Sequence, residues 1–72
     1  MGRKIELRVK QLLDEKGITQ KKLAELTGIR ESTISDISRG SRTVMNFEHI
    51  AKIADALNID DIRTIIELKK ID

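Results

Sequence analysis

The chain has 72 residues, no cysteine, a single histidine (His49) and a formal net charge of +2. This length allows one domain at most, and the composition excludes a disulfide framework, a Cys-ligated zinc site and a multi-histidine metal site. No apolar run approaches the roughly 18 residues that cross a membrane, and residues 1–10 lack the apolar core of a signal peptide, so we expect a cytoplasmic protein.

The first predicted element is a helix over residues 5–16. Apolar residues recur from Ile5 at helical spacing, and Gly17 is placed to end the helix. The start of this helix stays open, because Ile5, Leu7 and Val9 also alternate along the chain and are compatible with an extended segment.

The second predicted helix spans residues 20–27. Thr19 precedes it and is a good N-cap, since its hydroxyl can accept a hydrogen bond from the first free amides. We expect Leu23, Ala24 and Leu26 to point inward.

The third predicted helix spans residues 31–39. Gly28 turns the chain before it, and Gly40 closes it. Ile34 and Ile37 are its only large apolar residues, so it should bury one narrow face and leave the rest outside.

The fourth predicted helix spans residues 47–57, with Asn46 as N-cap. Its expected buried side chains are Phe47, Ile50, Ile53, Ala54 and Leu57. The fifth predicted helix spans residues 61–70, where Asp60 can cap the helix and also complements its N-terminal dipole. The sequence therefore predicts a single all-α domain of five helices over residues 1–72.

The segment over residues 20–39 has the spacing of a helix-turn-helix. Ala24 is small enough for the two helices to cross closely, and Ile29 joins the isoleucines of the third helix in an apolar seam. The expected outward residues of the third helix are Glu31, Ser32, Ser35, Asp36 and Arg39. Short polar side chains on a slim helix can enter a major groove about 12 Å wide and reach base edges.

The segment "ITQKKLAELTGIRESTISDISRG" resembles the Cro and lambda-repressor type of helix-turn-helix, the XRE family. The matching features are Thr19-Gln20, Leu23-Ala24, Thr27-Gly28-Ile29, Ser32, Ile34-Ser35 and Arg39-Gly40, and "FEHIAKIADALNI" resembles the family's fourth helix. The resemblance covers roughly residues 7–66. It implies a compact lambda-repressor-like domain that binds double-stranded DNA sequence-specifically and regulates transcription in a prokaryotic or phage setting, as a repressor.

The resemblance also implies roles for single residues. Gln20 falls where the family often binds a phosphate, and Glu31, Ser32 and Asp36 fall on base-reading positions. Arg30 stands where a small capping residue is usual, and because arginine is a poor cap, we expect it to contact a phosphate or guanine instead.

The same resemblance implies that a second set of residues contacts the DNA backbone. Ser35 and Arg39 are expected to reach phosphates from the third helix, and Arg42 and Asn46 from the loop and cap that follow. Met45 stands where the family often has proline, so the loop before the fourth helix can differ in shape.

Three of these charged residues also have a structural alternative. Glu31 can complement the N-terminal dipole of the third helix, and Arg39 the C-terminal dipole. Asp36 can pair with Arg39 or Lys22 on the surface, or accept a hydrogen bond from cytosine N4 and so discriminate among bases.

The C-terminal segment is more apolar than a small core requires. Its apolar residues are Ile62, Ile65, Ile66, Leu68 and Ile71. An exposed apolar patch indicates a partner surface, and in the resembled family a C-terminal helix commonly pairs two subunits. A homodimer would set two recognition helices about 34 Å apart on a near-palindromic operator.

Two other function classes are alternatives to this regulator. The same fold serves as the antitoxin of toxin–antitoxin pairs, in which the partner is a protein toxin and DNA binding is autoregulatory. An enzyme is disfavoured, because the sequence offers no nucleophile–base pair, metal cluster or phosphate-cradling loop, and we expect no cofactor.

Overall fold

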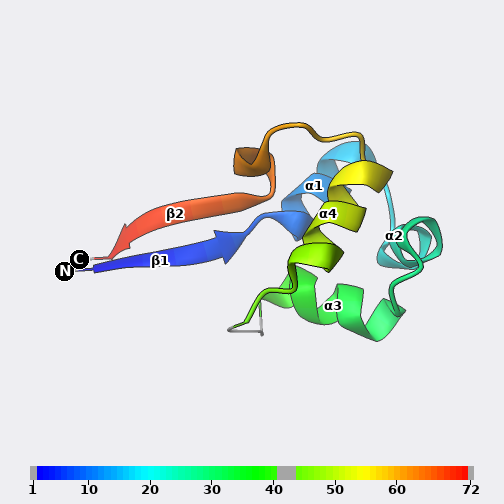
Figure 1. The fold of residues 1–72 in the computed structure, drawn as a ribbon, viewed down its shortest axis with the longest axis horizontal. Coiled ribbons are helices and arrows are strands. Elements are labelled where there is room, and N and C mark those ends of the chain that lie inside the picture. The colour runs from blue at the N-terminus through cyan, green and yellow to red at the C-terminus, as the bar shows by residue number, and fades with distance from the viewer. Residues whose placement is uncertain (1, 41–43, 72) are drawn as a thin grey trace.

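The computed structural model describes residues 2–40 and 44–71. In chain order its elements are β1 (Gly2–Leu7), α1 (Val9–Lys16), α2 (Gln20–Thr27), α3 (Glu31–Arg39), α4 (Phe47–Ala56), the 3-10 helix η1 (Ile62–Thr64) and β2 (Ile66–Ile71). The helices form a body from which β1 and β2 project as a two-stranded ribbon, with both chain ends at its tip (Figure 1).

The prediction of an all-α domain of five helices is wrong. The expected first helix is shorter, because residues 2–7 form β1, and the expected fifth helix is replaced by η1 and β2. The alternation of Ile5 and Leu7 with charged residues continues in Ile66 and Leu68, and a period of two suits a half-buried strand. Each strand supplies the hydrogen-bonding partner that the other needs.

The ribbon is antiparallel and joins the body where the two strands meet it. Leu7 lies opposite Ile66 at this base, and both side chains are half-buried against the core. The backbone N–H of Arg8 donates to the carbonyl of Ile65 over 2.6 Å. The start of α1 is therefore tied directly to the start of β2.

One apolar core lies among the helices. Its buried members are Val9, Leu12, Leu13, Leu23, Ile29, Ile34, Ile37, Ile50, Ile53, Leu57 and Ile65. Each such side chain contributes about 1.5–3 kcal/mol when it is fully removed from water. The set draws on all four helices, so the position of α3 depends on the whole body.

Two side chains expected to be buried are instead exposed. Leu26 is 49% exposed and Phe47 is 79% exposed. Leu26 lies at the edge of the buried face of α2, which Leu23 occupies. Phe47 is the first residue of α4, and helical side chains lean toward the N-terminus, so its ring extends beyond the end of the helix.

Within residues 2–40 and 44–71, no helix has the length and apolar character needed to span a bilayer.

Candidate nucleic-acid interface

The first helix of the helix-turn-helix begins at a side-chain cap. Thr19 has an extended backbone, and its Oγ1 accepts a hydrogen bond from the backbone N–H of Lys22 at 3.0 Å. The predicted N-cap is confirmed. Gln20 therefore occupies the first position of α2 and is half-buried there.

The turn between α2 and α3 is held by a threonine hydroxyl. Thr27 Oγ1 donates to the carbonyl of Leu23 at 2.8 Å and accepts from the N–H of Ile29 at 3.2 Å. Gly28 takes a left-handed backbone (φ 74°), which a side chain would strain. Sequence reasoning assigned no role to Thr27, although a threonine directly before a helix-ending glycine is a usable signal.

The third helix is fixed to the body by the predicted isoleucine seam. Ile29, Ile34 and Ile37 are 7%, 0% and 6% exposed, respectively. The seam is confirmed. Because Ile34 and Ile37 occupy one side of α3, its other side is presented away from the core.

The start of α3 has no side-chain cap. Arg30 is the N-cap residue and is exposed, and no cap hydrogen bond forms from its side chain. Its guanidinium therefore does not serve the helix. Glu31 is exposed in the first turn, where a carboxylate is favoured by the helix dipole.

The outward side of α3 carries the residues expected to read bases. Glu31 and Ser32 are exposed, and Ser35 and Asp36 are half-buried. Glu31 and Ser35 lie one turn apart, as do Ser32 and Asp36, so the four share one polar surface. The structure thus brings these predicted residues together on one helix.

Asp36 is ion-paired to Arg39, three residues further along α3. The two side chains are 33% and 65% exposed, so the pair is worth only about 0–1 kcal/mol in water. This was one of the structural alternatives for Asp36. The guanidinium also places positive charge directly beside this carboxylate.

One of the three serines of α3 lies on the inner side. Ser38 is 9% exposed, and its Oγ has no hydrogen-bond partner among the described residues. It lies four residues after Ile34 and therefore belongs to the buried stripe. Of the three serines, only Ser32 and Ser35 lie on the outward side of α3.

The segment after α3 holds one described residue that was predicted to contact DNA, Asn46. Asn46 Oδ1 accepts hydrogen bonds from the backbone N–H groups of Glu48 (2.9 Å) and His49 (3.3 Å). This confirms the predicted N-cap of α4. Its oxygen is committed to the helix, and its side-chain amide is the group that can donate. Arg42 lies outside the described residues.

The residues expected to form a dimer surface do not share one surface. Ile65 is 1% exposed and belongs to the core, whereas Ile62 is 59% exposed on η1. Ile66 is half-buried at the base of the ribbon, and Leu68 and Ile71 are 65% and 44% exposed further along β2.

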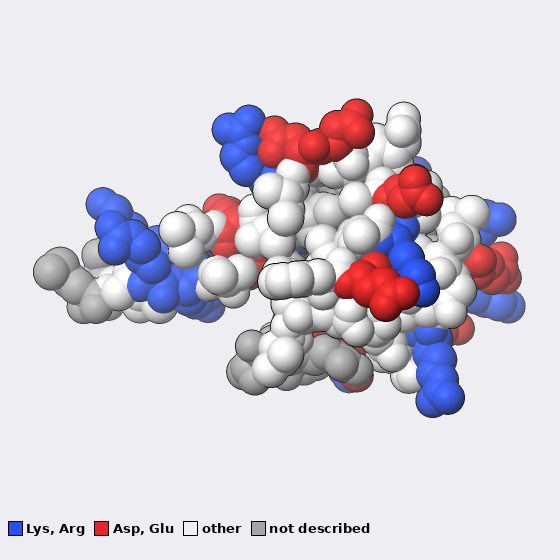
Figure 2. Space-filling model, viewed as in Figure 1, with Lys and Arg blue, Asp and Glu red and all other residues white. Residues whose placement is uncertain are grey.

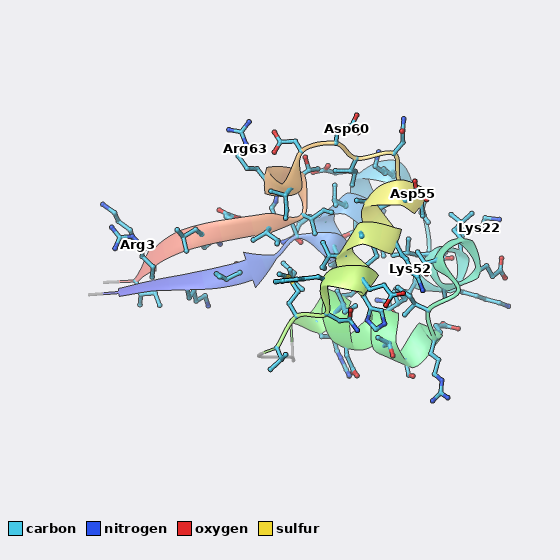
Figure 3. All side chains as sticks on the ribbon, viewed as in Figure 1. Arg3, Lys22, Lys52, Asp55, Asp60 and Arg63 are labelled. Carbon is cyan, nitrogen blue, oxygen red and sulfur yellow. The ribbon has the colours of Figure 1, made fainter. Side chains whose placement is uncertain are left out.

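Positive charge is spread over both ends of the molecule. Arg3 lies near the ribbon tip and Lys22 on α2 at the opposite end (Figure 3), and Lys and Arg side chains gather over the ribbon (Figure 2). On the ribbon, hydrogen bonds from Lys4 and Lys69 lower the pKa of Glu6.

Two contacts between Asp61 and Arg63 hold the segment before β2. Asp61 accepts a hydrogen bond from the backbone N–H of Arg63 at 3.0 Å and also pairs with the guanidinium at 2.8 Å. These bonds from Arg63 lower the pKa of Asp61. Asp61, and not the predicted Asp60, is the capping residue here.

Comparison with known proteins agrees with this geometry. The model of the Cro/C1-type HTH DNA-binding domain matches residues 8–70. The chain is 33% identical to a Bacteroides fragilis protein named a "putative DNA-binding protein", with 89% of this chain and 100% of that chain covered and a TM-score of 0.77.

The crystal structure of the transcriptional regulator VanUg is similar in fold. The match covers 96% of this chain and 89% of the VanUg chain, with a TM-score of 0.72 at 21% identity. No curated protein matches the sequence.

Proposed function

Because the chain belongs to the Cro/C1-type HTH DNA-binding domain family, we propose that it is a transcriptional repressor that binds a near-palindromic operator as a homodimer. DNA binding, and not catalysis, is the function of this family. The repressor acts by occupancy, because a domain bound over a promoter excludes polymerase.

The observation that carries the proposal is the division of α3 into two sides. Ile34 and Ile37 hold one side in the core, and the other side presents Ser32 and Asp36. With α3 in the major groove, Asp36 accepts a hydrogen bond from a cytosine N4 amino group, and Ser32 reaches an adjacent base edge.

Phosphate contacts surround the base-reading residues. Gln20 approaches the backbone from the start of α2, where free amides and the helix dipole also favour an anion. Arg30, Arg39 and Asn46 contact phosphates along α3 and at the start of α4. These contacts set the register on the duplex and give affinity, whereas the base contacts give specificity.

Selection from a random pool of DNA duplexes at low salt tests the proposal. We expect the purified full chain to enrich related sequences with two-fold symmetry and cytosines in each half-site. A pool that stays random after repeated rounds would overturn the regulator function. Enrichment of a site without symmetry would overturn the homodimer part alone.

A further inference from the structure

A hollow of about 400 Å³ lies between β1, the start of α1 and the end of α3. This volume is within the range of pockets that bind small molecules. Polar side chains from all three elements line the hollow, among them Lys4, Glu6, Lys10, Gln11, Ser38 and Arg39. A molecule held there would contact the last turn of α3 from the side of the ribbon.

The helix α1 begins at this hollow without a side-chain cap. Its N-cap residue is Arg8, which makes no cap hydrogen bond, and its first turn holds no acidic residue. The first intrahelical hydrogen bond runs from the N–H of Leu12 to the carbonyl of Arg8. The helix therefore supplies no acceptor to the N–H groups of Val9, Lys10 and Gln11. Free amides at a helix N-terminus favour an anion.

A buried hydroxyl from α3 lines the same hollow. Ser38 is only 9% exposed, and its Oγ has no hydrogen-bond partner among the described residues. Burying a hydroxyl without a partner is unfavourable, so such a group in a folded protein calls for an explanation. An oxygen atom of a ligand in the hollow would accept the hydrogen bond that Ser38 can donate.

The carboxylates that line the hollow already have cationic partners. Glu6 is paired with Lys4 at 3.0 Å, and Asp36 is paired with Arg39. Lys10 also lines the hollow, and within residues 2–40 and 44–71 it makes no ion pair. Its ammonium group is therefore available to a bound anion, next to the free amides at the start of α1.

We propose that this hollow binds a small molecule with a phosphate or carboxylate group. Lys10 and the first amides of α1 hold the oxyanion, and Ser38 donates a hydrogen bond to it. The side-chain amide of Gln11 can hydrogen-bond the rest of the molecule. The ligand belongs to the class of small oxyanions, and the start of α1 and the buried side of α3 recognise it together.

Occupancy of the hollow should also weaken DNA binding, and this part rests on the proposed function. Arg39 lines the hollow and is proposed to contact a DNA phosphate. An anion bound beside Arg39 attracts its guanidinium and competes with the DNA for it. Because such coupling is reciprocal, bound DNA lowers the affinity for the anion by the same factor.

Amide chemical shifts of the full chain, recorded by NMR during titration with inorganic phosphate or with acetate, test the site. We expect saturable shifts at the amides of Lys10, Gln11 and Ser38 with at least one of the two anions, and no such shifts with sodium chloride at equal ionic strength. The anion that saturates at the lower concentration shows whether the ligand carries a phosphate or a carboxylate. Saturation by neither anion, or shifts confined to Gln20 and Arg30, would overturn the site.

Three variants separate the proposed contacts from general effects of charge. Lys10→Gln should raise the dissociation constant of the anion about tenfold, because a charged donor is lost. Lys16→Gln makes the same change of charge at the other end of α1 and should leave this constant within about twofold of wild type. Equal effects of the two substitutions would overturn the role of Lys10.

Ser38→Ala should raise the dissociation constant of the anion about fivefold. Without the anion, it should keep or raise the thermal stability, because no hydrogen bond of the described fold is lost. A variant that is less stable but binds the anion as tightly as wild type would show that Ser38 serves the fold alone.

DNA titration by fluorescence anisotropy, with and without the saturating anion at constant ionic strength, tests the regulatory part. We expect the anion to raise the dissociation constant of the selected duplex about fivefold or more. Lys10→Gln should bind this duplex as wild type does and lose most of the response to the anion. Equal DNA affinity in both conditions would overturn the regulation and leave the site intact.

The remaining outcomes distinguish the site from the proposed function. A chain that binds the anion at α1 but selects no DNA sequence would uphold the site and overturn the regulator. A chain that selects a DNA sequence but binds neither anion would overturn the site alone.

Discussion

At the scale of single residues, the carboxylate of Asp36 is the least expected group on a surface proposed to meet phosphates. Its ion pair with Arg39 reduces the repulsion that an isolated carboxylate would experience there. A carboxylate held in this way can still accept a hydrogen bond from a cytosine amino group. Asp36 is thus suited to choosing among bases and contributes little to overall affinity.

Replacing Asp36 by alanine should therefore change specificity more than affinity. We expect discrimination at one base position to fall by about 1–3 kcal/mol, with binding to unrelated DNA equal or tighter because a negative charge is lost. Binding titrations against duplexes that vary one base pair at a time measure this. Asp14→Ala removes the same charge at an exposed position of α1 and should leave the base-preference profile unchanged. An unchanged profile for Asp36→Ala would exclude a role of Asp36 in reading bases.

Thr27 is the residue that joins the two helices of the motif. Its hydroxyl bonds Leu23 and Ile29 on either side of Gly28. Thr27→Val keeps the shape but leaves the part-buried N–H of Ile29 without its acceptor, so we expect a loss of about 1–2 kcal/mol in the free energy of unfolding. Urea denaturation measures the loss.

Thr33→Val on α3 is the control for Thr27→Val, because no side-chain hydrogen bond of Thr33 is present in the described part of the chain. Its free energy of unfolding should stay within about 0.5 kcal/mol of wild type. Equal effects of the two substitutions would show that the Thr27 bridge has no special role.

At the scale of elements, the cap of α4 links helix stability to the proposed DNA contact of Asn46. Asn46 accepts two backbone hydrogen bonds through one oxygen. Aspartate is an equally good cap, so Asn46→Asp should keep the free energy of unfolding while its charge weakens binding to every duplex. Asn46→Ala should lose about 1 kcal/mol of stability.

Thermal unfolding and DNA titration of the two Asn46 variants separate these roles. If Asn46→Asp binds DNA as tightly as wild type, the residue does not face phosphates. If Asn46→Ala is as stable as wild type, the cap is not important for α4.

The ribbon should respond to acid through Glu6. Hydrogen bonds from Lys4 and Lys69 hold the pKa of Glu6 below its ordinary value of 4.5. A carboxylate whose pKa is lowered by folding stabilises the folded state above pH 4.5, and this stability is lost as pH falls through the lowered pKa. Glu6→Gln should therefore be less stable than wild type at neutral pH, and the difference should shrink in acid.

Denaturation of wild type and Glu6→Gln across this pH range tests the assignment. A difference in stability that stays constant with pH would show that the ion pairs of Glu6 do not hold the ribbon.

Elements whose ends are marked by nearby residues were predicted correctly, and elements that depend on distant residues were not. Both helices of the motif were predicted with their observed bounds, because Thr19 and the glycines Gly28 and Gly40 mark their ends within a few residues. The ribbon was not predicted as such, since β1 and β2 lie at opposite ends of the sequence. Neither strand is stable before the chain folds and brings them together.

The candidate interface was predictable to a similar degree. The spacing of Ile34 and Ile37 correctly indicated which side of α3 is buried, and hence which side faces outward. The burial of Ser38 and the bridging hydroxyl of Thr27 depend on how α3 packs on its neighbours, which the periodicity of one helix does not contain. The exposure of Phe47 was not predicted for the same reason, because its position on the helix does not show where the helical body ends.

At the scale of the whole molecule, the helical body and the ribbon are two distinct parts. The body fixes α2 and α3 and presents one polar helix surface. The ribbon extends from it along the longest dimension, 40 Å against 23 and 21 Å. Changes on α3 should therefore alter DNA recognition more than changes on β2 do.

The most direct test of sequence-specific DNA binding compares one selected duplex with its scrambled counterpart over a range of salt concentrations. Fluorescence anisotropy gives both dissociation constants. We expect both dissociation constants to rise steeply with salt, as phosphate contacts release counterions, and the selected duplex to bind about a thousandfold or more tightly. Equal affinity for the two duplexes at every salt concentration would exclude sequence-specific binding.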